Sequence, residues 1–265
     1  MRKKKRATYI GVDIRRTTQS WELWAGIAGV FLTLLWGCEG GTIKDSSVIH
    51  VIWWSTYGIQ FLFVMIFCAL PYAGSICEDI EYNYIKQSVI RGSLFRYCVG
   101  KIITIINTSI ITMVTGMVLF VGVLLRRLPW IEIEDSVYQT AIRSGSFRWA
   151  LQNEHYWLYI ILFSAELGIL TSMLSLSATY ISTFISNKLI IFSTPIIVYY
   201  FITQYGNQLS GGSPWLDLNY IFSGTKNIAD NDLMSFIYAI CVGTIVNIFL
   251  FCLIYLRLKK RVFGD

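Results

Sequence analysis

The chain has 265 residues, of which 55% are hydrophobic and 14% are charged, and its mean hydropathy is +0.55. This composition excludes an ordinary soluble domain, in which about 25% of the residues are charged. The formal net charge of +6 does not indicate nucleic-acid binding, because the basic residues flank apolar runs and form no soluble basic face.

Six runs are apolar enough to cross a membrane as helices, for which a length of about 20 residues is needed. They cover residues 21–37, 51–75, 102–125, 156–177, 189–205 and 233–256. The sequence therefore predicts an all-α polytopic membrane protein with six transmembrane helices. Residues 1–265 are predicted to form a single transmembrane domain.

Residues 1–20 form a basic segment ahead of the first run. We interpret it as a cytoplasmic segment at the membrane interface, where the anionic headgroups of membrane lipid attract it. Six spans place both termini on one side. If that side is the cytoplasm, the inner segments hold 16 of the 22 lysines and arginines, and the outer loops hold the other six. The positive-inside rule therefore predicts cytoplasmic termini.

The sequence shows no motif that carries chemistry. It contains neither a phosphate-binding loop nor a nucleophile turn of the Gly-x-Ser-x-Gly type. Its six cysteines lack Cys-x-x-Cys spacing, and its two histidines, His50 and His155, stand far apart. No metal-ligand cluster follows from this pattern. We expect no enzyme activity, no catalytic residue, no metal site and no cofactor bound by this chain.

The segment 78–94, between the second and third runs, has the pattern of an amphipathic helix. At 100° per residue its residues divide between two faces, one with Tyr82, Ile85 and Val89 and the other with Ile80, Tyr84 and Arg91. Acids open the segment and Gly92 is a suitable stop. The pattern alone leaves two interpretations open, a linker on the membrane surface or a helix that contacts a cytosolic partner.

The run EYNYIKQSVIRGSLFRYCVGK, residues 81–101, resembles the segment after the second span in permease subunits of ABC-2 type ABC transporters. The likeness is closest to the small six-span permeases that export antimicrobial or toxin-like peptides or confer immunity to them. The matching residues are Glu78, Glu81, Lys86, Gly92, Ser93, Tyr97 and Lys101. The sequence departs from the family pattern at Asn83, where glycine is common, and at Leu94, where a basic residue is common.

The resemblance implies a bacterial plasma-membrane exporter whose ATPase is a separate subunit that binds ATP and Mg²⁺. Segment 78–94 would be its coupling helix, with contacts from Glu78, Glu81, Tyr84, Lys86, Arg91 and Gly92. A second permease, either another copy or a paralogue, would complete a path for a peptide or another amphipathic substrate. The positions in this chain that match the path are Trp54, Tyr57, Gln60, Tyr199, Gln204 and Tyr205.

Glu166, within LFSAELGIL, stands near the middle of the fourth run. An ionised side chain at that depth costs roughly 3 kcal/mol on insertion scales, so we expect it to face protein or water. Two roles remain open, a contact with cargo on the substrate path or a hydrogen bond that ties two helices together. Two other functions also remain open, an ion-coupled secondary carrier that uses Glu166 and a non-transporting immunity or scaffold protein.

Overall fold

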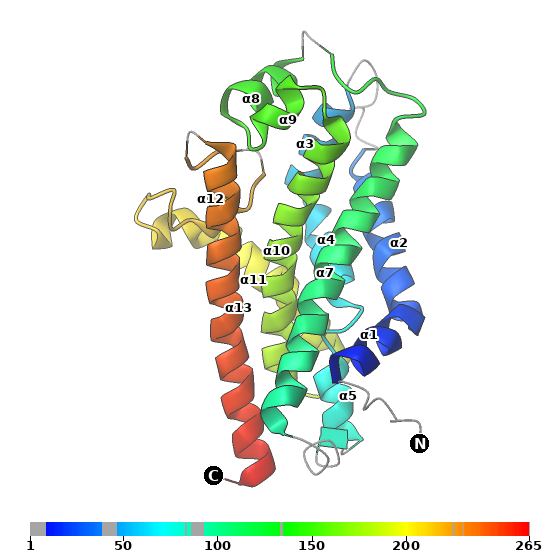
Figure 1. The fold of residues 1–265 in the computed structure, drawn as a ribbon, viewed down its shortest axis with the longest axis vertical. Coiled ribbons are helices and arrows are strands. Elements are labelled where there is room, and N and C mark those ends of the chain that lie inside the picture. The colour runs from blue at the N-terminus through cyan, green and yellow to red at the C-terminus, as the bar shows by residue number, and fades with distance from the viewer. Residues whose placement is uncertain are drawn as a thin grey trace, which may run out of the picture.

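The structure is a computed structural model that describes residues 9–38, 47–82, 84–85, 93–132, 135–224, 226–229 and 231–264. Over these residues every regular element is a helix, and the helices form an elongated bundle (Figure 1). They are α1 (Tyr9–Gln19), α2 (Trp21–Trp36), α3 (Val48–Tyr57), α4 (Phe61–Ala69), α5 (Ser75–Glu81), α7 (Leu94–Leu124), α8 (Ser136–Ser144), α9 (Arg148–Gln152), α10 (Tyr156–Ser182), α11 (Lys188–Leu209), α12 (Leu218–Ile221) and α13 (Asp232–Phe263).

Four helices, α7, α10, α11 and α13, are long and apolar enough to cross a membrane. The bent pair α3 and α4 adds a fifth if it counts as one span, and the apolar helix α2 is shorter, at 16 residues. The chain is therefore a multi-pass helical membrane protein. The count of six spans is not confirmed and stays a prediction.

The expected second span is not one straight helix. Between α3 and α4 the chain bends by 80°. Gly58 ends α3 in an extended conformation (φ −70°, ψ 157°), and the side chain of Gln60 fills the space where a Cβ on Gly58 would stand. The span predicted over residues 51–75 is therefore broken by a bend at Gly58, which the apolar run did not reveal.

Helix α10 lies at the centre of the bundle, packed by α7, α13, α11 and α4. One face of it carries small residues, and α7 approaches that face closely. A Cβ on Gly168 would stand 3.1 Å from the Cα of Ile110, and the hydroxyls of Ser109 and Ser175 are 2.9 Å apart. Close backbone approach at small residues is a usual way to pack helices in a membrane.

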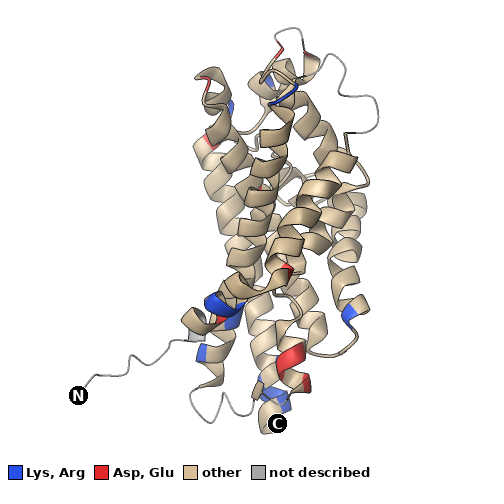
Figure 2. Ribbon diagram, turned by 90° about the vertical axis from the view of Figure 1, so that its right-hand side faces the viewer, with Lys and Arg blue, Asp and Glu red and all other residues tan. Residues whose placement is uncertain are grey.

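Charged residues gather toward the two ends of the bundle, and the middle is mostly uncharged (Figure 2). The end that holds α1, α5 and the last turns of α13 is called the lower end below, and the end with α8 and α9 the upper end (Figure 1). Four expected spans are parts of longer helices, since α7 begins at Leu94, α10 ends at Ser182, α11 ends at Leu209 and α13 ends at Phe263.

Candidate functional site

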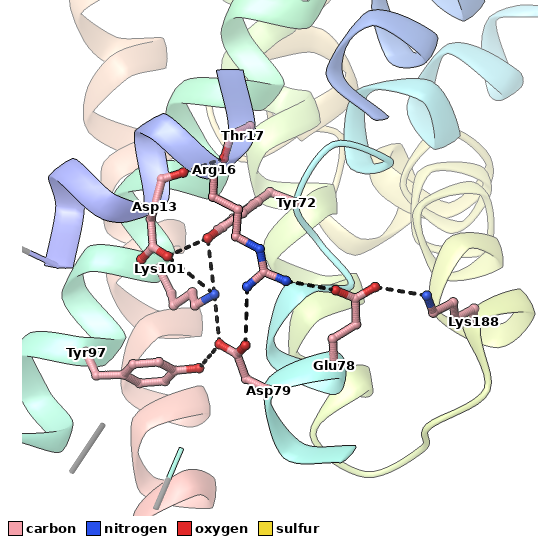
Figure 3. A network of polar contacts seen from close by, with 9 residues as sticks. All are labelled: Asp13, Arg16, Thr17, Tyr72, Glu78, Asp79, Tyr97, Lys101 and Lys188. Atoms are coloured by element: carbon pink, nitrogen blue, oxygen red, sulfur yellow. Dashed lines mark hydrogen bonds and ion pairs between the residues drawn. The ribbon is translucent and has the colours of Figure 1, made fainter. Parts of the chain in front are cut away.

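A buried ion cluster joins α1, α5 and α7 near the lower end of the bundle (Figure 3). At its centre the Lys101 ammonium lies 2.8 Å from the Asp79 carboxylate and 3.5 Å from that of Asp13. Lys101 is 1% exposed and Asp79 is 3% exposed. A charge buried to this degree is tolerated only when it is paired and hydrogen-bonded, and here both conditions are met.

Two tyrosines complete the surroundings of Lys101. The Tyr72 hydroxyl donates to Asp13 at 2.6 Å and accepts from Lys101 at 3.1 Å. The Tyr97 hydroxyl donates to Asp79 at 2.6 Å. The Lys101 nitrogen also stands 4.7 Å from the centre of the Tyr72 ring, within range of a cation–π interaction. Residues from α1, α5 and α7 and from the turn before α5 thus hold one cation.

Ion pairs extend the cluster outward to α11. Arg16 on α1 lies 3.5 Å from Asp79 and 3.3 Å from Glu78. The other oxygen of Glu78 pairs with Lys188, at the start of α11, at 2.9 Å. These outer pairs are partly exposed to solvent and so contribute less than the buried centre. They connect the acidic beginning of α5 to two further helices.

The structure covers part of the predicted coupling helix. Helix α5 begins at Ser75 and ends at Glu81, and α7 begins at Leu94, where the Ser93 hydroxyl accepts the N–H of Arg96 at 3.3 Å. One continuous helix over 78–94 is therefore not confirmed. The predicted contacts Lys86, Arg91 and Gly92, together with Val89, lie outside the described residues.

The described residues of that segment do not all face where the helical pattern predicted. Ile85 is buried in the lower core, as expected, and Tyr84 is 46% exposed. Tyr82 was expected to lie against the bundle, but it is 79% exposed. The chain leaves helical geometry at Tyr82 (φ −84°, ψ 8°), so spacing at 100° per residue no longer applies. Glu81 accepts a hydrogen bond from the Cys77 thiol at 3.7 Å.

A cavity of about 380 Å³ lies between the α3–α4 bend and helices α10, α11 and α12. Its lining includes Tyr57, Tyr199 and Gln204, three of the residues predicted for the substrate path. Gln60 sits at the bend itself, against Gly58. Neither Gln60 nor two other predicted residues, Trp54 and Tyr205, line this cavity. The ring of Trp54 stacks on His50, and that of Tyr205 packs on Phe201.

Glu166 is 3% exposed, which confirms the prediction that it faces protein and not lipid. Its Oε2 has no hydrogen-bond partner among the described residues. The Tyr159 hydroxyl, on the same helix, accepts a hydrogen bond from the indole N–H of Trp53 at 2.9 Å. Glu166 stands next to Leu167 and one turn from Leu170 along α10, and these two leucines line the cavity.

The ion cluster contains residues that the sequence analysis did not select, namely Asp13, Arg16, Tyr72, Asp79 and Lys188. Lys101 itself could have indicated such a cluster. It stands at the edge of an apolar run, and a lysine buried there needs a counter-ion. The acids that serve it lie 88 and 22 residues away along the chain, so spacing within one segment could not identify them.

At the upper end, Asp135 joins α3 to α8. Its carboxylate accepts the N–H of Val137 at 2.9 Å and the hydroxyl of Ser47 at 3.0 Å, and it lies 2.9 Å from His50 Nδ1. Burial raises the pKa of Asp135, but the hydrogen bonds from His50, Val137 and Ser47 outweigh burial. The pKa therefore lies below the ordinary value of 3.8.

We expect Asp135→Ala to lower the free energy of unfolding by about 1–2 kcal/mol at neutral pH, as for a lost helix N-cap. A carboxyl with a lowered pKa stabilises the fold above its unfolded pKa and loses this effect as pH falls through the folded pKa. The difference between wild type and variant should therefore begin to shrink as pH falls below about 3.8, and it should vanish only below the lowered pKa of the folded state. Thermal unfolding in detergent at neutral and acid pH measures it. An equal difference at both pH values would show that the ionised carboxyl is not responsible.

No family model, curated protein or solved structure matches this chain. The resemblance to ABC-2 permeases therefore stays a prediction from the sequence.

Proposed function

We propose that the chain is the membrane-spanning permease subunit of an ATP-driven exporter in a bacterial plasma membrane, with cytoplasmic termini. Its cargo is an amphipathic peptide of the antimicrobial or toxin type. One observation carries the proposal. The acidic residues that open the family-like segment, Glu78 and Asp79, are bound to cations from α1, α7 and α11.

This arrangement gives a physical route for coupling. A partner ATPase that seats on the segment after α5 displaces α5 when ATP draws two ATPase subunits together. Because Asp79 is tied to Lys101 and Glu78 to Arg16 and Lys188, α7, α1 and α11 follow that displacement. ATP and Mg²⁺ belong to the partner subunit, and a second permease, either a copy or a paralogue, completes the path.

The cavity at the α3–α4 bend is the cargo contact in this proposal. It combines aromatic rings, at Tyr57 and Tyr199, with the amide of Gln204. Ligand sites are commonly apolar cavities of roughly 300–1,000 Å³ with a few polar groups, and this cavity falls in that range. The rings offer surface to the apolar face of an amphipathic peptide, and the hydroxyls and the amide serve its polar face.

Association with an ATPase tests the proposal. The tagged chain, purified from its native membrane, should retain a nucleotide-binding subunit. Combining Tyr84→Ala with Arg91→Glu should weaken that association by roughly 700-fold, since aromatic and arginine anchors at an interface commonly contribute about 2 kcal/mol each. The variant permease should stay stable in detergent, because Tyr84 is half exposed.

Ile85→Asp serves as the matched comparison. Ile85 is 4% exposed, so this change should damage folding of the permease itself. Wild-type chain that retains no nucleotide-binding subunit, or the two variants failing in the same way, would contradict the proposal.

An ion-coupled carrier that uses Glu166 remains the second candidate, because a buried carboxyl with an unpartnered oxygen suits a proton site. Transport that follows a proton gradient without ATP would favour it.

A further inference from the structure

A second cavity, of about 240 Å³, lies at the lower end where α1, α2, the turn before α5 and the start of α11 meet. It is separate from the cavity at the α3–α4 bend. Its polar lining includes Arg16 and Lys188, the acids Glu22 and Glu78, and Ser75. Charged side chains of both signs therefore face one small enclosed space.

The two cations have hydrogen-bond donors to spare. Arg16 uses one nitrogen on Asp79 and another on Glu78, and Lys188 makes one bond, to Glu78. A guanidinium has five N–H donors and an ammonium has three. Ser75 adds a hydroxyl that is buried and has no hydrogen-bond partner among the described residues. Arg16, Lys188 and Ser75 together suit the oxygens of a phosphate group.

The cavity also offers an acceptor for a cation. Glu22, in the first turn of α2, forms no hydrogen bond or ion pair with any residue that the structure describes. It lies within electrostatic range of Glu78, a second carboxylate, and of the cations Arg16 and Lys188, and all of them line the cavity. An ammonium group placed beside Glu22 would give its carboxylate a hydrogen-bond partner of its own. Two cations and two carboxylates also leave the lining without net charge, which favours a zwitterion over a simple anion.

The rest of the lining fits the membrane interface. Leu70, Pro71 and Phe192 give the cavity an apolar side. Trp21, which is also in the lining, is 78% exposed. Tryptophan is enriched where the hydrocarbon of a membrane meets its headgroups. With the lower end in the cytoplasm, the cavity opens at the inner leaflet.

We propose that this cavity binds the headgroup of a phospholipid with a primary amine, phosphatidylethanolamine. Its phosphate accepts hydrogen bonds from Arg16, Lys188 and the Ser75 hydroxyl, and its ammonium donates to Glu22. The cavity walls come from four separate elements, so a bound lipid joins α1 and α2 to α5 and α11. This inference uses the orientation in the proposed topology but needs neither the ATPase nor the cargo.

Headgroup selectivity tests the proposal. The purified, delipidated chain is mixed in detergent with phosphatidylethanolamine, phosphatidylcholine or phosphatidylglycerol of identical acyl chains. A ligand that binds only the folded state raises the melting temperature, here by about 5 °C for phosphatidylethanolamine. Phosphatidylcholine should give a much smaller shift, because its quaternary ammonium has no N–H to donate to Glu22. Phosphatidylglycerol lacks the amine altogether and should also give a smaller shift.

Glu22→Gln should reduce the shift with phosphatidylethanolamine to the level of phosphatidylcholine. Glu132→Gln, which makes the same chemical change at an exposed acid elsewhere, should keep the full shift. The shift is compared within each variant, so a change in baseline stability does not affect the result. Native mass spectrometry of the same samples should show bound phosphatidylethanolamine on the wild type and less on Glu22→Gln.

Three results would overturn the proposal. Equal shifts for phosphatidylethanolamine and phosphatidylcholine, or no shift with either, would show that the amine is not recognised. An equal or larger shift with phosphatidylglycerol would show that the site takes any anionic lipid. An equal shift with soluble glycerophosphoethanolamine would show that the site binds a soluble molecule and not a membrane lipid. Failure of the exporter proposal would appear separately, as a missing ATPase.

Discussion

Replacing Lys101 by methionine is expected to lower the free energy of unfolding by about 3–5 kcal/mol, the usual cost of leaving a buried charge without its partner. Asp79 and Asp13 would then lie close together, 3% and 8% exposed, without the ammonium that now stands between them. Thermal or denaturant unfolding in detergent measures the loss. The yield of monodisperse protein after extraction should fall with it.

Two further variants make the result specific. Combining Lys101→Met with Asp79→Asn removes the closest pair of buried charges together, so the double variant should lose much less stability than the sum of the two single variants. Lys188→Met removes a lysine that also pairs with an acid of α5, but its side chain is 59% exposed. Its loss should therefore cost about 1 kcal/mol or less. Additive effects at Lys101 and Asp79 would contradict the geometry of the ion cluster.

The second large effect is expected at Glu166. Glu166→Lys should fail to assemble. A new cation at mid-membrane depth costs roughly 3 kcal/mol or more in insertion free energy, and it would have no counter-ion in the bundle. Glu166→Gln keeps the size of the side chain and should insert and fold, but export of the peptide cargo should change. The measurements are membrane yield and transport by permease reconstituted with its ATPase.

The cavity wall offers a matched pair of tyrosines for the same assay. Tyr199→Leu should reduce transport, because Tyr199 lines the cavity, whereas Tyr205→Leu makes the same change on the same helix outside the lining. If Glu166→Gln transports at the wild-type rate across a range of pH, the carboxyl serves structure alone. If the two tyrosine variants behave alike, the cavity is not on the cargo path.

Several helices could be predicted from the sequence because their boundaries are marked locally. The expected start at residue 156 is the first residue of α10, and the expected segment 21–37 differs from α2 by one residue at its end. Apolar composition and length determine these elements, and both can be counted within a single segment. The four longest helices were all expected, although each of them extends further than its apolar run.

The bend at Gly58 and the ion cluster could not be predicted in this way. Residues on both sides of Gly58 are apolar, and one conformation at a glycine decides the direction of the chain. In the ion cluster, Arg16 meets acids 62 and 63 residues away, and only the packed fold brings them together. Of the residues predicted for the substrate path, Tyr57, Tyr199 and Gln204 line one cavity, and their role in transport stays a prediction. Tyr205 follows Tyr199 by six residues and therefore points about 240° away around α11.

The bend between α3 and α4 joins two short helices without a continuous helical backbone. No hydrogen bond inside either helix has to break when the angle between them changes, because the turn at Gly58 already interrupts the helical ladder. The Gln60 side chain packs against Gly37 and Gly58 and occupies the space where a Cβ on either glycine would stand. Tyr57 and Phe61, on either side of the bend, both line the cavity of about 380 Å³. The backbone conformation at Gly58 and the packing of Gln60 therefore place the α3 and α4 residues that form this part of the cavity wall.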